Sequence, residues 1–273
     1  MEAAGCKSFT ENPFWRFATY FSALQIRQAE ATRLPTIFTI TPTYTRLEQK
    51  AELTRMASTL LHIQALHWIV VEDSVNKTAL VSSFLVKSGL PFTHLAVKTP
   101  PNVTKSRGAL QRNLGLKWLR DKYGASRPAE GVVHFADDDN TYSLDIFQEM
   151  RDTKMVSVWP VAFVGGLRYE SIDLDSSGKV RAWKVKYDPG RPFAIDMAGF
   201  AVKLDLILEK QQAWFNPYAK GGYQESSLLE DLVMLEELEP RADNCTKILV
   251  WHTRTEHPST GLDRGFTDLA VEV

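Results

Sequence analysis

Apolar and polar positions along residues 35–136 follow two periods that predict strands and helices in turn. Short runs of β-branched and other apolar residues predict strands, and stretches with apolar positions at helical spacing predict helices. The expected strands are 35–41, 67–71, 93–97 and 131–136, and the expected helices between them are 47–61, 80–86 and 108–123. Strands that alternate with helices in this way favour βαβ units, and therefore an α/β fold with a mostly parallel sheet.

The pattern changes after Ser143, where extended segments dominate. Ser143 is a candidate N-cap for a helix over 144–151, and residues 156–164 predict a strand. The polar run 175–178 predicts a hairpin turn, and a further helix is expected over 226–238. We expect this half to continue the sheet with added β-structure and to pack directly against the first half. The 273 residues correspond to one large domain or to two closely joined ones.

Composition and charge exclude several classes of protein. Hydrophobic residues make up 44% and charged residues 24%, and 32 basic against 33 acidic residues leave a net charge of −1. No overall field therefore attracts the chain to nucleic acid or anionic lipid, and any bound anion must be held locally. We expect a soluble chain as written, because the sequence contains no apolar run long enough for a membrane span and no signal segment within residues 1–33. Two cysteines are too few for a disulfide framework or a cysteine zinc site.

Three consecutive aspartates, Asp137, Asp138 and Asp139, follow the expected strand 131–136. Their charges repel one another, and they cannot all cap one helix. Mg²⁺ or Mn²⁺ would resolve this repulsion, since these ions bind one or two carboxylates together with substrate phosphates. The alternative interpretation is a solvated acidic turn. Ligands of open parallel sheets bind beyond the carboxyl ends of the strands, which favours the metal site.

Two pairs of cationic residues are candidates for binding an anion. Arg107 and Arg112 lie at the start of the expected helix 108–123, where free N–H groups already favour negative charge. His252 and Arg254 follow the expected strand 247–250 and share one face of an extended chain. The alternatives are a solvated helix face for the first pair, and a core histidine with a surface arginine for the second.

Other strand and helix ends carry further candidates. Tyr44, in the turn that begins at Pro42, would stack on a base, and Asp73 would bind the polar edge of that base. Glu225 follows a glycine-containing loop at an expected helix start. Its carboxylate is either stabilised by the helix dipole or positioned as a general base.

Short segments spread over residues 34–273 are specific enough to indicate a family. They are Leu34-Pro-Thr-Ile37, Thr41-Pro-Thr-Tyr44, Gln49-Lys-Ala-Glu-Leu-Thr54, Trp68-Ile-Val-Val-Glu-Asp73, Phe135-Ala-Asp-Asp-Asp-Asn-Thr-Tyr142, Val156-Ser-Val-Trp-Pro-Val161, Val164-Gly-Gly166, Arg191-Pro-Phe-Ala-Ile-Asp-Met-Ala-Gly-Phe200 and Leu249-Val-Trp-His-Thr-Arg-Thr255. Together they resemble the animal β-1,3-glucuronyltransferases. Within that family, residues 221–229 and 265–268 resemble the branch that starts the HNK-1 epitope more than the proteoglycan-linkage branch.

This resemblance implies a GT-A-like fold, UDP-glucuronate as donor, Mn²⁺ as cofactor, and transfer with inversion to the 3-hydroxyl of a terminal galactose on glycoprotein or proteoglycan-linkage glycans. It divides the chain into a stem-like, poorly ordered segment (1–33), a UDP-sugar-binding subdomain (34–140) and an acceptor-binding subdomain (141–273). It also implies a homodimer, toward whose partner subunit the tail 265–273 reaches. The implied location is the lumenal face of the Golgi membrane, through an anchor that is not visible in this chain.

The resemblance also assigns roles to individual residues. Glu225 is the implied catalytic base and Asp139 the implied metal ligand. The implied donor-binding residues are Pro42, Tyr44, Asp73, Arg107, Arg112, Asp137, Asp138, Asp139, His252 and Arg254. The implied acceptor-binding residues are Glu170, Arg191 and Asp196.

Two alternative functions remain open at the level of sequence. A nucleotidyltransferase that makes nucleotide sugars also uses a parallel sheet and an aspartate-bound metal, but it normally has a glycine-rich loop near the first strand. The turn 42–44 contains no glycine. A non-catalytic glycan-binding module on the same fold is the second alternative.

Overall fold

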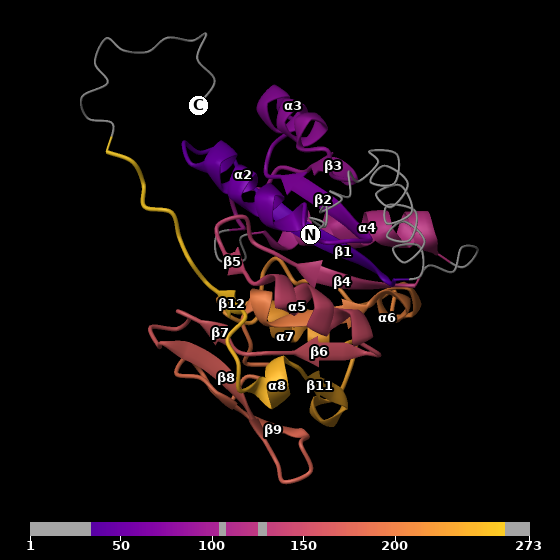
Figure 1. Cartoon of the computed structure of the whole chain (residues 1–273), viewed down its shortest axis with the longest axis vertical. Coiled ribbons are helices and arrows are strands. Elements are labelled where there is room, and N and C mark those ends of the chain that lie inside the picture. Colours follow the sequence, from indigo (N-terminus) through magenta and orange to yellow (C-terminus); the bar gives the residue numbers. More distant parts are fainter. Residues whose placement is uncertain (1–33, 104–107, 125–129, 260–273) are drawn as a thin grey trace, which may run out of the picture. The chain divides into compact units, whose positions relative to one another are not determined.

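A mixed sheet of seven strands forms the centre of the part of the chain that the computed structural model describes, which is residues 34–103, 108–124 and 130–259 (Figure 1). In spatial order its strands are β11 (Leu238–Pro240), β6 (Val156–Val158), β10 (Phe200–Lys203), β4 (Gly131–Phe135), β1 (Thr36–Thr43), β2 (Leu66–Glu72) and β3 (Phe92–Ala96). Only β10 among these strands runs antiparallel to its neighbours. The expected α/β fold with a mostly parallel sheet is therefore confirmed.

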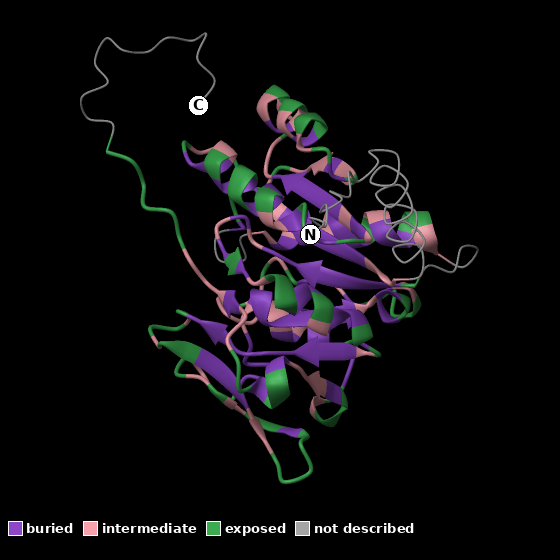
Figure 2. Ribbon diagram, viewed as in Figure 1, coloured by how far each residue is buried: buried purple, intermediate pink, exposed green. Residues whose placement is uncertain are grey.

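Helices cover both faces of this sheet, because its central strands are apolar on both sides. Helices α2 (Gln49–Leu60) and α3 (Ala79–Ser88) pack on one face, and α4 (Ala109–Tyr123) packs on the other with α6 (Leu204–Glu209) beside it (Figure 1). Alternate residues of β2 belong to different core layers: Trp68 and Val70 pack with α2 and α3, whereas Ile69 and Val71 pack with α4. Strands β6, β10, β4, β1 and β2 are almost entirely buried (Figure 2).

A second sheet of five strands lies among the described residues of the second half. Its order is β5 (Thr141–Tyr142), β12 (Val250–Trp251), β7 (Val161–Ala162), β8 (Tyr169–Leu174) and β9 (Val180–Lys184). The predicted hairpin turn is confirmed, since β8 and β9 pair on either side of it. Asp175 accepts hydrogen bonds from the backbone N–H groups of Ser177 and Lys179 at 2.8 and 3.0 Å, and Gly178 supplies the left-handed conformation with φ +81°.

The predicted strand over 156–164 is wrong, because the structure divides it into β6 and β7 in different sheets. Pro160 lies between them and has no N–H to donate to a ladder. Trp159 still lies beside the residues that precede β10. Its backbone N–H donates to the carbonyl of Gly199 at 3.0 Å, and its indole N–H donates to Ala198 at 2.8 Å.

The predicted helix over 226–238 is also wrong in length. Helix α7 (Gln224–Leu229) is short, and it is followed by the 3₁₀ helix η3 (Leu235–Glu237) and by β11. The chain turns after Leu229, whose carbonyl accepts from both Leu232 and Val233 at 3.0 Å. Leu238 then pairs with Val156 at the edge of the large sheet, so tertiary packing overrides the helical pattern.

Short elements complete the described part. They are α5 (Leu144–Glu149), for which Ser143 is the N-cap as predicted, η1 (Met150–Asp152), η2 (Met197–Gly199) and α8 (Ala242–Cys245). Of the helices in the described ranges, none combines the length and apolar character that crossing a bilayer requires. The expected stem-like segment, 1–33, lies outside the described residues.

Candidate active site

A cleft of about 780 Å³ lies at the carboxyl ends of β1, β2 and β4, a volume within the range of small-molecule sites. It brings together nine of the ten residues expected at the donor, which are Pro42, Tyr44, Asp73, Arg112, Asp137, Asp138, Asp139, His252 and Arg254. The tenth, Arg107, lies outside the described residues. Parallel strands end at the same edge of a sheet, so residues far apart in sequence meet there.

One end of the cleft presents an exposed aromatic ring and a fixed carboxylate. Tyr44 is 53% exposed, and the guanidinium carbon of Arg46 lies 4.4 Å from its ring centroid. Asp73 follows β2, and its Oδ1 accepts the backbone N–H of Thr99 at 2.8 Å. Burial opposes ionisation of Asp73, but the hydrogen bonds from Thr99 and the ammonium of Lys98 outweigh it, so the pKa of Asp73 lies below its ordinary value.

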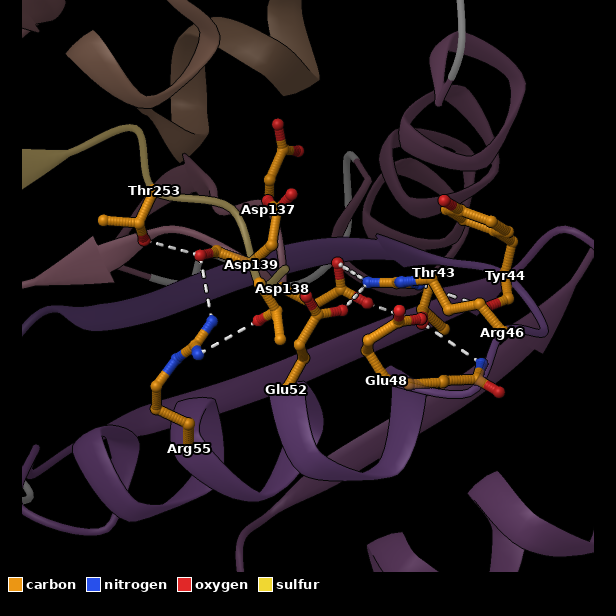
Figure 3. Close-up of polar contacts among 12 residues, drawn as sticks. Thr43, Tyr44, Arg46, Glu48, Glu52, Arg55, Asp137, Asp138, Asp139 and Thr253 are labelled. Carbon is orange, nitrogen blue, oxygen red and sulfur yellow. Dashed lines mark hydrogen bonds and ion pairs between the residues drawn. The ribbon is translucent and has the colours of Figure 1, made fainter. Parts of the chain in front are cut away.

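The three consecutive aspartates have three different environments (Figure 3). Asp137 pairs with the guanidinium of Arg112. Asp138 is buried and accepts from the Thr43 hydroxyl and from Nη2 of Arg46, both at 2.7 Å, and its burial raises its pKa to about 6. Asp139 is half-buried, and its carboxylate has no hydrogen-bond or ion-pair partner among the described residues. Desolvation first, and then the neighbouring Asp137 charge, raise the pKa of Asp139.

This arrangement fits a hard divalent cation held by one carboxylate. The described residues contain no group of three or more histidine, cysteine, aspartate or glutamate side chains arranged for a metal. Asp137 and Asp138 are already paired with arginines, whereas Asp139 offers uncompensated charge in the wall of the cleft. An ion of the Mg²⁺ or Mn²⁺ type takes one or two carboxylates and completes its shell with phosphate oxygens and water. Asp139 is therefore the residue that would hold it.

Arg112 lies in the first turn of α4, and its side chain folds back over the residue that precedes the helix. Gly108 precedes α4 with φ +79°, and a Cβ built on it would lie 2.5 Å from Nη1 of Arg112. Only glycine fits both the left-handed backbone and this close approach. The guanidinium is thereby held in the wall of the cleft beside Asp137.

The C-terminal wall of the cleft comes from the residues after β12. The His252 backbone N–H donates to the Ala162 carbonyl at 2.9 Å, and its Nδ1 lies 3.5 Å from Oδ2 of Asp196. Asp196 raises the pKa of His252, which favours the imidazolium form in the cleft. Arg254 is exposed in the same wall. His252 therefore connects the cleft with an expected acceptor residue.

The expected acceptor residues lie next to the cleft, outside its lining. Glu170 and Asp196 line a separate cavity of about 10 Å³, which is enough for about one water molecule. Burial raises the pKa of Glu170 despite the nearby Arg191 charge. Arg191 is buried, donates to the Gly222 carbonyl, and lies 5.2 Å from the ring centroid of Tyr187.

Glu225 is the second residue of α7 rather than the residue before a helix. It is half-buried, and its Oε2 is a buried oxygen without a hydrogen-bond partner in the described part of the chain. Burial raises the pKa of Glu225 to about 7, and Asp196 adds to this effect, while Arg112 and Arg191 oppose it. A carboxyl group with such a pKa can accept a proton near neutral pH.

Arg46 and Arg55 are among the residues of this region that were not predicted from the sequence. Arg46 lines the cleft, and its guanidinium pairs with Asp138 and Glu52 (Figure 3). Arg55 of α2 donates to the Asp139 carbonyl at 2.9 Å. Arg46 lies two residues after Tyr44 in the same loop, so its position near the cleft could have been predicted from the sequence. The contact of Arg55 with Asp139 depends on tertiary packing and could not.

Comparison with known proteins identifies the family. Residues 56–256 match the model of "Glycosyltransferase family 43". The protein named galactosylgalactosylxylosylprotein 3-beta-glucuronosyltransferase 1 is 58% identical over 252 residues in both Rattus norvegicus and Homo sapiens, covering 88% of this chain and 75% of the relative. The protein of the same name numbered 2 from Mus musculus is 55% identical over 228 residues, covering 82% of this chain and 70% of that relative.

The comparison with solved structures concerns the fold alone. The crystal structure of S. aureus TarS 1-349 matches with a TM-score of 0.50 at 17% identity, over 80% of this chain and 60% of that chain. With the mostly parallel sheet, this likeness confirms the expected GT-A-like α/β architecture. The expected resemblance to the β-1,3-glucuronyltransferases is confirmed by the sequence matches. The chain therefore belongs to glycosyltransferase family 43, among its 3-β-glucuronosyltransferases, and is a glycosyltransferase.

Proposed function

We propose that this chain transfers glucuronate from UDP-glucuronate to the 3-hydroxyl of a terminal galactose, with inversion at the anomeric carbon and with Mn²⁺ as cofactor. The observation that carries the proposal is the placement of Glu225. Its Oε2 is buried and unpartnered among the described residues, and it lies in the fields of both Arg112 at the donor cleft and Asp196, one of the expected acceptor residues. The names of the 58% identical relatives supply the sugar and the linkage.

The proposed donor site is a cleft with a base-binding end and a cationic end. Tyr44 would stack on the uracil and Asp73 would accept from it, since both line the end of the cleft that β1 and β2 form. Arg112, His252 and Arg254 would neutralise the diphosphate and the glucuronate carboxylate. When bound at Asp139, Mn²⁺ supplies further counter-charge for the departing diphosphate.

The proposed reaction is a single displacement that needs one base. The galactose 3-oxygen forms a bond to the anomeric carbon of glucuronate while the bond from that carbon to the phosphate oxygen breaks, and UDP leaves with the bonding electrons. The proton of the attacking hydroxyl passes to the Glu225 carboxylate. Inversion follows because the base and the leaving group lie on opposite faces of the sugar, as in inverting glycosidases.

The proposal includes a homodimer on the lumenal face of the Golgi membrane, with family membership as its support. The tail expected to reach the partner, 265–273, lies outside the described residues. Sedimentation at micromolar concentration should give twice the mass of 30.9 kDa, and deletion of the tail should weaken the association. A monomer that keeps full activity would contradict this part of the proposal.

The function is tested by transfer of labelled glucuronate from UDP-glucuronate to two acceptors, N-acetyllactosamine and galactosyl-galactosyl-xylose. We expect a product that β-glucuronidase cleaves, no product in excess chelator, and restoration by Mn²⁺. Comparison of the two acceptors identifies the branch of the family. Absence of transfer to both, in a protein that is folded by circular dichroism, would contradict the proposed function.

A further inference from the structure

The six residues after β12, 252–257, belong to no helix or strand, and we call them the donor arm. Its even and odd residues have different partners. His252 and Arg254 line the donor cleft. The intervening residues contact the opposite side, where Thr253 donates to the Asp139 carbonyl at 2.6 Å and Thr255 accepts from Arg55 at 3.3 Å.

The odd residues of the donor arm, 253, 255 and 257, each have a described attachment. The Asp139 carbonyl accepts from Thr253 and also from Nη2 of Arg55, at 2.9 Å (Figure 3). Nη1 of the same guanidinium reaches Thr255. Farther along, Nδ1 of His257 lies 2.6 Å from Oε1 of Glu48, the residue that precedes α2. Helix α2, Glu48 just before it and the loop that carries Asp139 therefore form the surface on which the arm rests.

Arg55 has a special place among these attachments because it contacts both sides of the junction. One of its nitrogens contacts the backbone of the loop that carries the aspartates, and the other contacts the arm. A guanidinium is suited to this task, since its donors are held in one rigid plane. Loss of Arg55 would leave Thr253 as the remaining described contact between the arm and Asp139.

We propose that Arg55 is a positioning residue for the donor: it fixes the donor arm against the loop that carries Asp139, and thereby holds His252 and Arg254 in the cleft. This inference rests on the proposed function for the identity of the donor. Arg55 is exposed on α2 and lies outside the lining of the cleft, so it acts through the arm rather than on the substrate.

The attachment itself is tested without nucleotide, by limited trypsin digestion and mass spectrometry of the cut after Arg254. Arg55→Ala should accelerate this cut about three- to tenfold, the effect of losing one net hydrogen bond from a locally opening segment. Arg55→Lys keeps the positive charge but not the planar guanidinium, so its rate of cutting should lie between those of Arg55→Ala and the unchanged protein. Lys117→Ala is the matched control, because it removes a positive charge from the exposed face of α4, where Lys117 pairs with Asp121 at 2.7 Å. Trypsin should cleave Lys117→Ala after Arg254 at the same rate as the unchanged protein.

The positioning role is tested by calorimetry with UDP, and by kinetics. Arg55→Ala should weaken UDP binding and raise the KM for UDP-glucuronate by a similar about three- to tenfold, with the KM for the acceptor and the melting temperature unchanged. A merely structural Arg55 would change the melting temperature instead. Equal digestion rates in Arg55→Ala and the unchanged protein would overturn the attachment, and faster digestion with unchanged UDP affinity would overturn the positioning role. A protein whose UDP affinity responds as expected, but which transfers no glucuronate, would contradict the proposed function while the inference stands.

Discussion

The carboxylate of Glu225 is poorly solvated in the fold, so its ionised form lowers the stability of the protein. This unfavourable free energy distinguishes a catalytic from a structural role. Glu225→Gln keeps the size of the side chain but cannot accept a proton, so kcat should fall about 10²- to 10⁴-fold. The folded pKa of about 7 lies above the ordinary value of 4.5, so the stabilisation by this group is present below the ordinary pKa and is lost as pH rises through 7. The variant should therefore melt no lower than the unchanged protein at pH 8, as measured by calorimetry.

The same carboxyl group predicts the pH profile of the reaction. Only the ionised form accepts a proton, so kcat should rise about tenfold between pH 6 and pH 8 and then level off. Burial of Glu225 is the main cause of the position of this rise, and the charges of Asp196, Arg112 and Arg191 modify it. Glu230→Gln is the control, since Glu230 is exposed at the end of the same helix. A flat profile with nearly normal kcat in Glu225→Gln would remove Glu225 from the mechanism.

Asp139 and Asp138 are neighbours with opposite expected responses to substitution. Asp139→Ala should abolish turnover and the Mn²⁺ dependence of UDP binding, because its carboxylate is the one without a partner among the described residues. Its stability should not fall. Asp138→Asn should lower the melting temperature, since Asp138 is buried between Thr43 and Arg46. Melting curves and Mn²⁺ titrations of UDP affinity check both. Full activity of Asp139→Ala would contradict the metal role.

At the scale of elements, the start of α4 depends on a glycine that contacts a donor residue. Gly108→Ala should cost about 1–2 kcal/mol of folding free energy for its left-handed backbone, and the new Cβ should displace the Arg112 guanidinium. UDP-glucuronate should then bind more weakly. Gly178→Ala is the matched control, since φ is +81° there and a Cβ would meet no atom within 4 Å. Equal UDP-glucuronate affinity in the two variants would contradict the placement of Arg112.

Elements whose apolar residues recur with a regular helical or strand spacing were predicted well. Elements whose bounds depend on tertiary contacts were not. The expected helix over 108–123 corresponds to α4 because its apolar positions face one layer of the core. Residues 156–164 are as apolar as a single strand, but Pro160 has no N–H for a ladder, and the two halves join different sheets. The end of α7 likewise depends on the pairing of Leu238 with Val156, which no local pattern contains.

At the scale of the whole molecule, the cleft combines the ends of strands from both sheets. Its position was predictable, because parallel strands place their carboxyl ends at one edge and three polar turns follow such strands. The environments of the individual groups were not. Asp137, Asp138 and Asp139 look equivalent in sequence, and only the packing of Arg112 and Arg46 leaves the third without a described partner. The pKa of Glu225 depends in the same way on burial that the sequence does not display.

Selectivity for the donor should depend on both sheets, since Arg112 begins a helix on the large sheet while His252 follows a strand of the second. Glucuronate differs from glucose by one carboxylate, and a hydrogen bond to such a charged group contributes about 1.5–3 kcal/mol. His252→Ala should therefore reduce the preference for UDP-glucuronate over UDP-glucose, measured as a ratio of kcat/KM values, by about ten- to hundredfold. Asp196 favours the cationic imidazole, so the preference should also weaken in the unchanged protein as pH rises through the elevated pKa of His252. His62→Ala, a substitution at an exposed histidine after α2, should leave the ratio unchanged. An unaltered ratio in His252→Ala would place recognition of the carboxylate on Arg112 and Arg254 alone.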